Sequence, residues 1–329
     1  MKPDNLNDLN KYRRNEYYKC PENEAYLKRI NVILRNEEIK DYKDIPVRYP
    51  YLFVFGLPRS GTTLMAQILI QSLDLSYINN FMARFWMAPL TGIKLSRIIL
   101  GNIKQTDLTS SYGSTNNIYD LHEFGYFWRY WLNIRSIQKI IRIKEREEQI
   151  DWAGLRTVLA NMQQEFGKAV CMKNIFGAYH LPKMIENVPE SIWIYIERSP
   201  LDVAISILNA RKKFYTNVNY WWSTIPLEYD QLKSEHYIDQ IAGQIYYLDQ
   251  FYKRQLNSVK PENIFKVDYR QLCQDPTFYI NALRNKLKER FGYLPEIKSI
   301  PTKLTYRTYE IDTEEKHSLK NALKKYKLL

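Results

Sequence analysis

Residues 51–73 read YLFVFGLPRSGTTLMAQILIQSL, and this stretch decides the fold class. Residues 51–55 are a short apolar run that ends at a glycine, which is typical of a fully buried strand. The residues from Leu64 onward form an apolar, helix-forming segment. A strand, a glycine-bounded turn and a helix in this order are the layout of a phosphate-binding loop in an α/β protein.

Three later apolar runs predict three further strands, at residues 169–172 (AVCM), 192–196 (IWIYI) and 263–267 (NIFKV). Helices are predicted between and after the strands, at residues 82–101, 151–166, 177–187, 201–211, 234–258, 276–291 and 312–327, and residues 105–117 are predicted as a loop. The alternation of strands and helices predicts an α/β fold with a parallel central sheet flanked by helices.

The domain organisation is predicted to be simple. The sequence contains no Pro/Gly/Ser-rich linker, no internal repeat and no low-complexity tract. Residues 1–329 are therefore expected to form one domain. Residues 1–48 are expected to be a helical extension at its N-terminal end, and residues 292–329 an extension at its C-terminal end.

The charge composition favours anionic partners. Lys and Arg number 48 and Asp and Glu number 36, which gives a net charge of +12. The densest basic cluster, residues 316–327, fits the solvated face of a last helix equally well. No RNA-binding motif, zinc finger or helix-turn-helix signal is visible, so nucleic acid is not an expected partner.

The sequence shows no feature that directs it to a membrane or an oxidising compartment. No apolar run reaches the roughly 18 residues that a transmembrane helix requires. The first thirty residues are too polar for a secretory signal. Three widely spaced cysteines, Cys20, Cys171 and Cys273, form no metal-ligand pattern and leave an odd thiol, so a reducing cytoplasm is the expected location.

The loop GLPRSGTT at residues 56–63 has the G-x-x-x-x-G spacing of a nucleotide-binding P-loop. A nucleoside-triphosphate loop continues with Lys, which reaches the terminal phosphates, but here Thr62 stands in that position. The only cation in the loop is Arg59. The loop therefore suits a phosphate-like group and lacks the usual equipment for magnesium-assisted phosphoryl transfer.

This loop resembles the 5′-phosphosulfate loop of sulfotransferases, which transfer a sulfuryl group from 3′-phosphoadenosine-5′-phosphosulfate (PAPS). The resemblance implies that Arg59 contacts the transferring group. It implies a donor-binding role for the other residues of the loop as well, namely Pro58, Ser60, Gly61, Thr62 and Thr63. No metal is expected.

Sulfotransferases also bind the 3′-phosphate of the donor with an Arg after a strand and a Ser eight residues later. Here Arg198 and Ser206 have this spacing, and an arginine offers a fixed fork of donors to a phosphate. Lys173, at the end of the strand at 169–172, resembles the strand-end Lys that many sulfotransferases place beside the bridging oxygen of the donor. The resemblance covers about residues 50–291 and includes a late element at residues 267–276.

The residue that takes the proton from the acceptor hydroxyl is not fixed by the resemblance. The segment after the phosphosulfate loop lacks the Glu that several bacterial and tyrosylprotein sulfotransferases carry there. The substitutes considered are Glu123 and His122, in the aromatic segment LHEFGYFWRYWL, where desolvation could strengthen a base. A start of a helix with the aromatic rings in the core explains the same segment. His180 is a weaker candidate.

The expected activity is transfer of a sulfuryl group from PAPS to a hydroxyl, or as a second choice an amine, of a small molecule, lipid or glycan. Residues 220–222 (YWW) are candidates for contact with the acceptor, and core packing explains them equally well. Two alternatives stay open. The first is a P-loop kinase or NTPase, and the second is a sulfotransferase-like protein that binds the nucleotide without catalysis.

Overall fold

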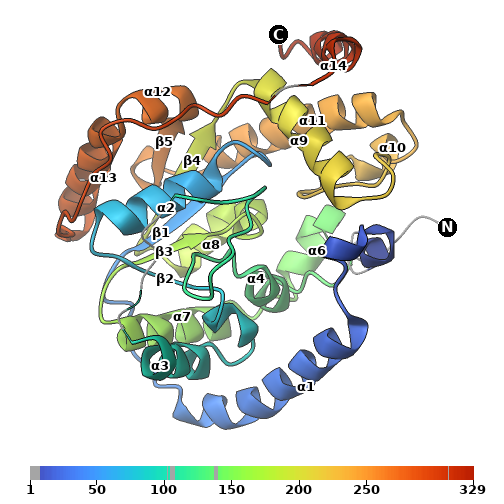
Figure 1. The fold of residues 1–329 in the computed structure, drawn as a ribbon. Coiled ribbons are helices and arrows are strands. Elements are labelled where there is room, and N and C mark those ends of the chain that lie inside the picture. Colours follow the sequence, from blue (N-terminus) through green and yellow to red (C-terminus); the bar gives the residue numbers. More distant parts are fainter. Residues whose placement is uncertain (1–7, 102, 104–107, 137–139, 310) are drawn as a thin grey trace.

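A five-stranded parallel sheet lies in the middle of the molecule (Figure 1). The computed structural model describes residues 8–101, 103, 108–136, 140–309 and 311–329. The strands follow the spatial order β2-β3-β1-β4-β5. Their bounds are β1 Tyr51–Gly56, β2 Ser76–Tyr77, β3 Val170–Lys173, β4 Ser191–Glu197 and β5 Ile264–Asp268. The four predicted strands are thus present, and the short edge strand β2 is an addition.

Helices cover both faces of the sheet because both faces are apolar. Along β1, Leu52 and Val54 point to one face, and Phe53 and Phe55 point to the other. The first face packs against α2 Thr62–Ser72, α12 Tyr269–Gln274 and α13 Pro276–Phe291. The second packs against α7 Trp152–Phe166, α8 Leu181–Asn187, α9 Pro200–Phe214 and α11 Tyr237–Asn257.

The remaining helices lie around this core. They are α1 Pro21–Glu38, α3 Pro89–Leu100, α4 Gly125–Trp131, α6 Ile143–Glu147, α10 Tyr229–Leu232 and α14 Thr313–Lys325. Short 3-10 helices occur at Asp8–Tyr12, Asn15–Tyr17, Ile39–Asp41, Met82–Arg84, Gly177–His180 and Pro261–Asn263. The lysines of residues 316–327 are exposed while Leu319 and Leu323 are buried, so the solvated face predicted for the last helix is present.

Two predicted helices are wrong in part, and proline explains both differences. Within residues 82–101 the α-helix begins only at Pro89, since the residue before a proline avoids the helical conformation. Within residues 177–187 a 3-10 turn precedes α8, and Pro182 occupies the first turn of that helix. Residues 108–117 contain no helix, as predicted, and residues 105–107 of that predicted loop lie outside the described residues.

The N-terminal helix α1 is fastened to the domain by buried polar side chains. Asn31 donates to the carbonyl oxygen of Arg84 at 2.8 Å and accepts from the amide of Met87 at 2.8 Å. Glu38 accepts from the amides of Leu90 and Thr91 at 3.0 and 2.6 Å, which are first-turn donors of α3. The Glu38 carboxylate therefore caps the N-terminus of α3, although Glu38 lies about 50 residues earlier in the sequence.

Replacing Glu38 with alanine is expected to lower the free energy of unfolding by about 2 kcal/mol, because two helix donors lose their acceptor in a buried place. Urea unfolding of the two proteins measures this change. The matched control is Glu37→Ala, which removes an exposed carboxylate paired only with Lys40. We expect that variant to stay within about 0.5 kcal/mol of the wild type. Equal stability of Glu38→Ala and Glu37→Ala would contradict the capping role.

Candidate active site

A cavity of about 810 Å³ opens at the carboxyl ends of the strands. Its walls include Leu57, which follows β1, Lys173 at the end of β3, Arg198 after β4 and Tyr269 after β5. From β1 the chain first builds the side of the sheet that holds β2 and β3, and then crosses to the side that holds β4 and β5. In an open parallel sheet this change of direction is where ligands bind.

The loop between β1 and α2 has the backbone geometry of an anion cradle. Gly61 has a φ of 108°, and a β-carbon there would lie 2.3 Å from the ring of Tyr269, so only glycine fits. Arg59 also adopts a positive φ, 68°. The first amides of α2 lack acceptors within the helix, and Thr62 and Thr63 of this first turn line the cavity.

The Arg59 side chain joins the loop to α9 and to the C-terminal segment. Its Nε donates to the Ser206 hydroxyl at 2.9 Å, and its Nη2 donates to the Tyr309 hydroxyl at 2.9 Å. Its guanidinium lies 4.9 Å from the ring centre of Tyr112. Burial acts to raise the pKa of Tyr309, but the charge of Arg59 and the hydrogen bonds with Ser206 and Arg59 lower it below its ordinary value.

Arg198 lies on the same side of the cavity as Arg59. Its Nη1 donates to the Arg59 carbonyl oxygen at 3.0 Å, its Nη2 donates to the carbonyl oxygen of Arg307, and its guanidinium stacks 4.4 Å from the ring centre of Tyr269. The Nε of Arg198 and the hydroxyl of Ser60 are buried and have no hydrogen-bond partner among the described residues. Such groups fit an anionic ligand, because a buried donor without a partner is costly.

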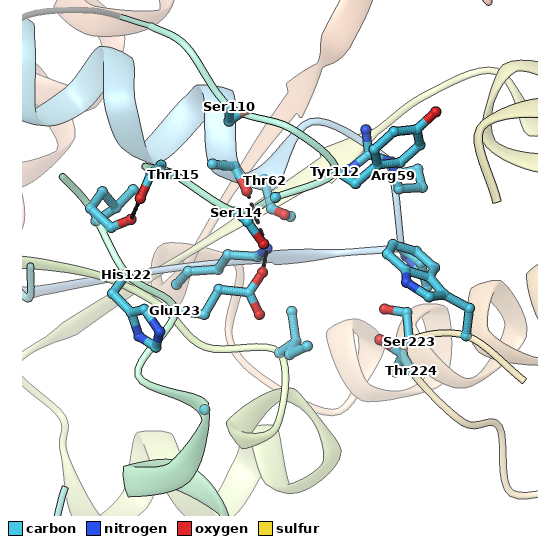
Figure 2. A pocket seen from close by; sticks show the side chains of 18 of the residues that line it. Arg59, Thr62, Ser110, Tyr112, Ser114, Thr115, His122, Glu123, Ser223 and Thr224 are labelled. Carbon is cyan, nitrogen blue, oxygen red and sulfur yellow. Dashed lines mark hydrogen bonds and ion pairs between the residues drawn. The ribbon is translucent and has the colours of Figure 1, made fainter. Parts of the chain in front are cut away.

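Lys173 and Glu123 form an ion pair on the other side of the cavity. The Lys173 Nζ contacts the Glu123 carboxylate and donates to the Thr63 hydroxyl at 3.2 Å. Lys173 is buried, and its strand position beside Val54 of β1 places it at the loop. Figure 2 shows Arg59 and Tyr112 on one side of the cavity and Glu123 and His122 on the other.

His122 is neutral, but its low pKa and its occupied lone pair make it a poor candidate for the base. Burial lowers its pKa to about 4, although the neighbouring Glu123 acts in the opposite direction. Its Nδ1 accepts from the amide of Phe124 at 2.8 Å, so the ring proton of the neutral form lies on Nε2. Neither nitrogen then has a free lone pair for the proton of a substrate.

The other residues considered from the sequence lie mostly outside the cavity. His180 is buried and bonds to Arg146 and Glu147, so its role is structural. Of residues 220–222, only Trp222 lines the cavity. Trp221 is buried 5.3 Å from the Arg211 guanidinium, and Tyr220 stacks on Tyr12.

A sequence model of the sulfotransferase family matches residues 50–291. The chain belongs to the sulfotransferase family. A search of curated proteins finds no match. Among solved structures, the fold is similar to that of sulfotransferase STF9 from Mycobacterium avium, with 14% identity, a TM-score of 0.50, and coverage of 89% of this chain and 72% of that chain. Sulfotransferase STF1 from Mycobacterium tuberculosis H37Rv gives 14% identity, a TM-score of 0.50, and coverage of 91% and 80%.

Most of the predicted site residues line this cavity of the sulfotransferase fold, but Ser60 and Ser206 are fully buried and are not among its lining residues. Arg59, Ser206 and Arg198 form one group, and Lys173 with Glu123 forms the other. Within the part of the chain that the structure describes, no hydrogen bond or ion pair joins the two groups directly. Thr63, which lies in the same loop as Arg59, accepts a hydrogen bond from Lys173.

Sequence reasoning missed the contributions of both chain extensions to this sulfotransferase cavity. Arg307 and Tyr309 enter it from the C-terminal side, and Arg13 and Lys19 enter it from the N-terminal side. These residues carry no motif, and no signal in the sequence marks them. Tyr112 belongs to the Ser-, Thr- and Gly-rich loop at residues 105–117, whose composition is the one available hint.

In the part of this sulfotransferase that the structure describes, no group of three or more His, Cys, Asp or Glu side chains is placed to hold a metal ion. None of the described helices combines the length and the apolar character needed to cross a membrane.

Proposed function

We propose that this protein transfers a sulfuryl group from PAPS to a hydroxyl group of an acceptor. The observation that carries the proposal is the Lys173–Glu123 pair beside Thr63, in the same cavity as the loop and the arginines. Membership of the sulfotransferase family supports a transfer of this kind.

The donor-binding roles follow from the chemistry of the side chains. The loop amides, Arg59 and the hydroxyls of Thr62 and Thr63 would hold the 5′-phosphosulfate. Arg198 would hold the 3′-phosphate with its fixed fork of donors, and Ser206 would contribute a hydroxyl. When bound, PAPS supplies the activated sulfuryl group.

The catalytic roles go to the ion pair. Glu123 would take the proton of the acceptor hydroxyl. The oxygen of that hydroxyl would bond to the sulfur of the donor while the bond between this sulfur and the phosphate oxygen breaks. Lys173 stabilises the negative charge that develops on that phosphate oxygen. As Lys173 turns toward this oxygen, Glu123 loses its counter-charge and becomes a stronger base. The geometry favours Glu123 over His122, whose lone pair is occupied.

We also propose that the acceptor is a small molecule, lipid or glycan and that the protein works in a reducing cytoplasm. The three cysteines are all free, and Cys171 and Cys273 are buried. These observations support a location in which disulfides are not formed.

Calorimetric titration with adenosine 3′,5′-bisphosphate and with 5′-AMP tests the donor site. We expect the wild type to prefer the bisphosphate, and Arg198→Ala to bind it about thirtyfold more weakly, since charge-assisted hydrogen bonds to the 3′-phosphate are lost. The matched control is Arg254→Ala, which removes an exposed arginine of α11 outside the cavity. A wild type without preference for the 3′-phosphate would overturn the proposed donor.

Turnover separates an enzyme from a protein that only binds the nucleotide. An acceptor screen with radiolabelled PAPS measures transfer to hydroxylated compounds. Tight binding of the bisphosphate with no transfer to any acceptor would favour the non-catalytic alternative. Magnesium-dependent turnover of ATP that survives Arg59→Ala would favour the kinase or NTPase alternative.

A further inference from the structure

Four cationic side chains form one wall of the cavity, away from the loop at residues 57–63. They are Arg13 and Lys19 from the N-terminal segment, Arg84 from the 3-10 helix Met82–Arg84, and Arg129 from α4. We call these four residues the cationic wall. Arg13 and Lys19 lie outside the stretch that matches the sulfotransferase family, whereas Arg84 and Arg129 lie inside it.

The members of the cationic wall are close enough to act on one another. The surrounding protein partly desolvates the Lys19 ammonium and lowers its pKa, and the charges of Arg13, Arg129 and Arg84 lower it further, against the opposing effect of Glu24. Burial likewise lowers the pKa of Arg129. The positive charges of the other three members therefore act on Lys19, and an anion bound among them would relieve this repulsion.

Negative charge on this side of the cavity is scarce. Two carboxylates among the described lining residues lie near the wall: Glu24 accepts a hydrogen bond from Tyr126, and Glu123 pairs with Lys173. The Arg84 side chain is exposed and lines the cavity. The Nε of Arg13 is buried and has no hydrogen-bond partner among the described residues. The four cations of the wall thus outnumber the carboxylates beside them.

The cationic wall lies beside the proposed base and not beside the donor arginines. Lys19 and Arg84 act electrostatically on His122, the residue next to Glu123. Lys19 donates to the Tyr126 hydroxyl at 2.7 Å, and the ring of Tyr126 lies 5.0 Å from that of Trp86. Arg59 and Arg198 instead bond to Ser206, Tyr309 and backbone carbonyls.

We propose that the acceptor of the sulfuryl group is an anion, which carries a carboxylate or phosphate that the cationic wall binds while its hydroxyl faces Glu123. Trp86 and Tyr126 provide the aromatic faces on which a sugar ring of such an acceptor packs. This inference rests on the proposed function, because it assigns the acceptor half of the same site.

A pair of probes that differ by one charge tests the inference by binding. Phenyl β-glucuronide and phenyl β-glucoside are titrated calorimetrically into the protein saturated with adenosine 3′,5′-bisphosphate. We expect the glucuronide to bind at least about tenfold more tightly, and its affinity to fall as salt is added. Equal affinity, or no binding of either probe, would overturn the inference. Glucose 6-phosphate against glucose, in the same titration, distinguishes a phosphate from a carboxylate.

Variants then assign the effect to the cationic wall. Arg84→Gln and Lys19→Gln are each expected to reduce the preference for the charged probe to about threefold or less. The control Lys28→Gln removes the same charge from the exposed face of α1, outside the cavity, and keeps the preference. If Arg84→Gln weakens the bisphosphate as much as the glucuronide, the wall serves the donor and the inference is wrong.

Failure of this inference and failure of the proposed function give different results. A wild type that does not bind adenosine 3′,5′-bisphosphate contradicts the proposed donor before any acceptor is added. A wild type that binds the bisphosphate and treats the two glycosides alike keeps the donor and loses the anionic acceptor.

Discussion

Glu123→Gln is expected to lower kcat by about 10² to 10⁴, the range that general-base catalysis contributes. The substitution keeps the shape of the side chain and removes its ability to take a proton from the acceptor hydroxyl. Binding of adenosine 3′,5′-bisphosphate should change little, since Glu123 touches Lys173 and not the arginines of the donor site. Transfer from radiolabelled PAPS to the best acceptor of the screen measures kcat, and calorimetry measures donor binding.

The cavity offers one competing carboxylate for the same role. Among the described lining residues, Glu24 is the other acid, and it bonds to the Tyr126 hydroxyl. If Glu24→Gln abolished transfer while Glu123→Gln retained it, the base would be assigned to the wrong residue. If both variants retained full activity, neither Glu24 nor Glu123 would act as the base.

Lys173→Met is expected to lower kcat by about 10² to 10³, because it removes the fixed positive charge beside the leaving phosphate oxygen. Methionine preserves most of the apolar volume of a side chain that is buried at the end of β3. Single-turnover transfer, with the enzyme in excess over PAPS, reports this step without the contribution of product release. The control Lys168→Met, at a partly exposed lysine paired with Asp74, should leave transfer near the wild-type rate.

The double variant tells whether Lys173 and Glu123 act as one unit. The two side chains are in contact, so their effects on kcat should not be additive, and the double variant should lose less than the product of the single losses. Fully multiplicative losses would mean that Lys173 and Glu123 contribute to the transfer independently, and that their contact has no part in it.

The central sheet could be predicted because its strands are buried on both faces. The four apolar runs stand out from a polar sequence, and each became a strand within about a residue of its predicted bounds. Strand β2 escaped prediction because two residues give no periodicity. The start of α3 was placed too early because the apolar pattern runs on through residues 82–88, and Pro89 decides where the helix begins.

The residues of the proposed donor site could be predicted from local motifs, and the other residues that line the cavity could not. Loop residues, Arg198 and Lys173 each follow a strand, so their shared edge of the sheet follows from topology. Arg59 and Ser206 are predicted to bind different phosphates, but in the structure they form a hydrogen bond with each other. This contact joins residues 147 positions apart in the sequence, so it depends on the tertiary fold. Arg13, Lys19, Arg307 and Tyr309 reach the cavity only through tertiary packing, which no local pattern encodes.

The contact between Arg59 and Tyr309 spans 250 positions, and the same cavity is also lined by Arg13 from the N-terminal segment. A chain that leaves the ribosome N-terminus first therefore cannot complete this cavity until residue 309 has been synthesised. Contacts of such separation form slowly, because a long loop must close before they give any stabilisation. The proposed nucleotide donor would therefore stabilise only the completed fold, by an amount set by its concentration relative to Kd. A fragment that stops at residue 291, where the family match ends, would lack Tyr309 and therefore its hydrogen bond with Arg59.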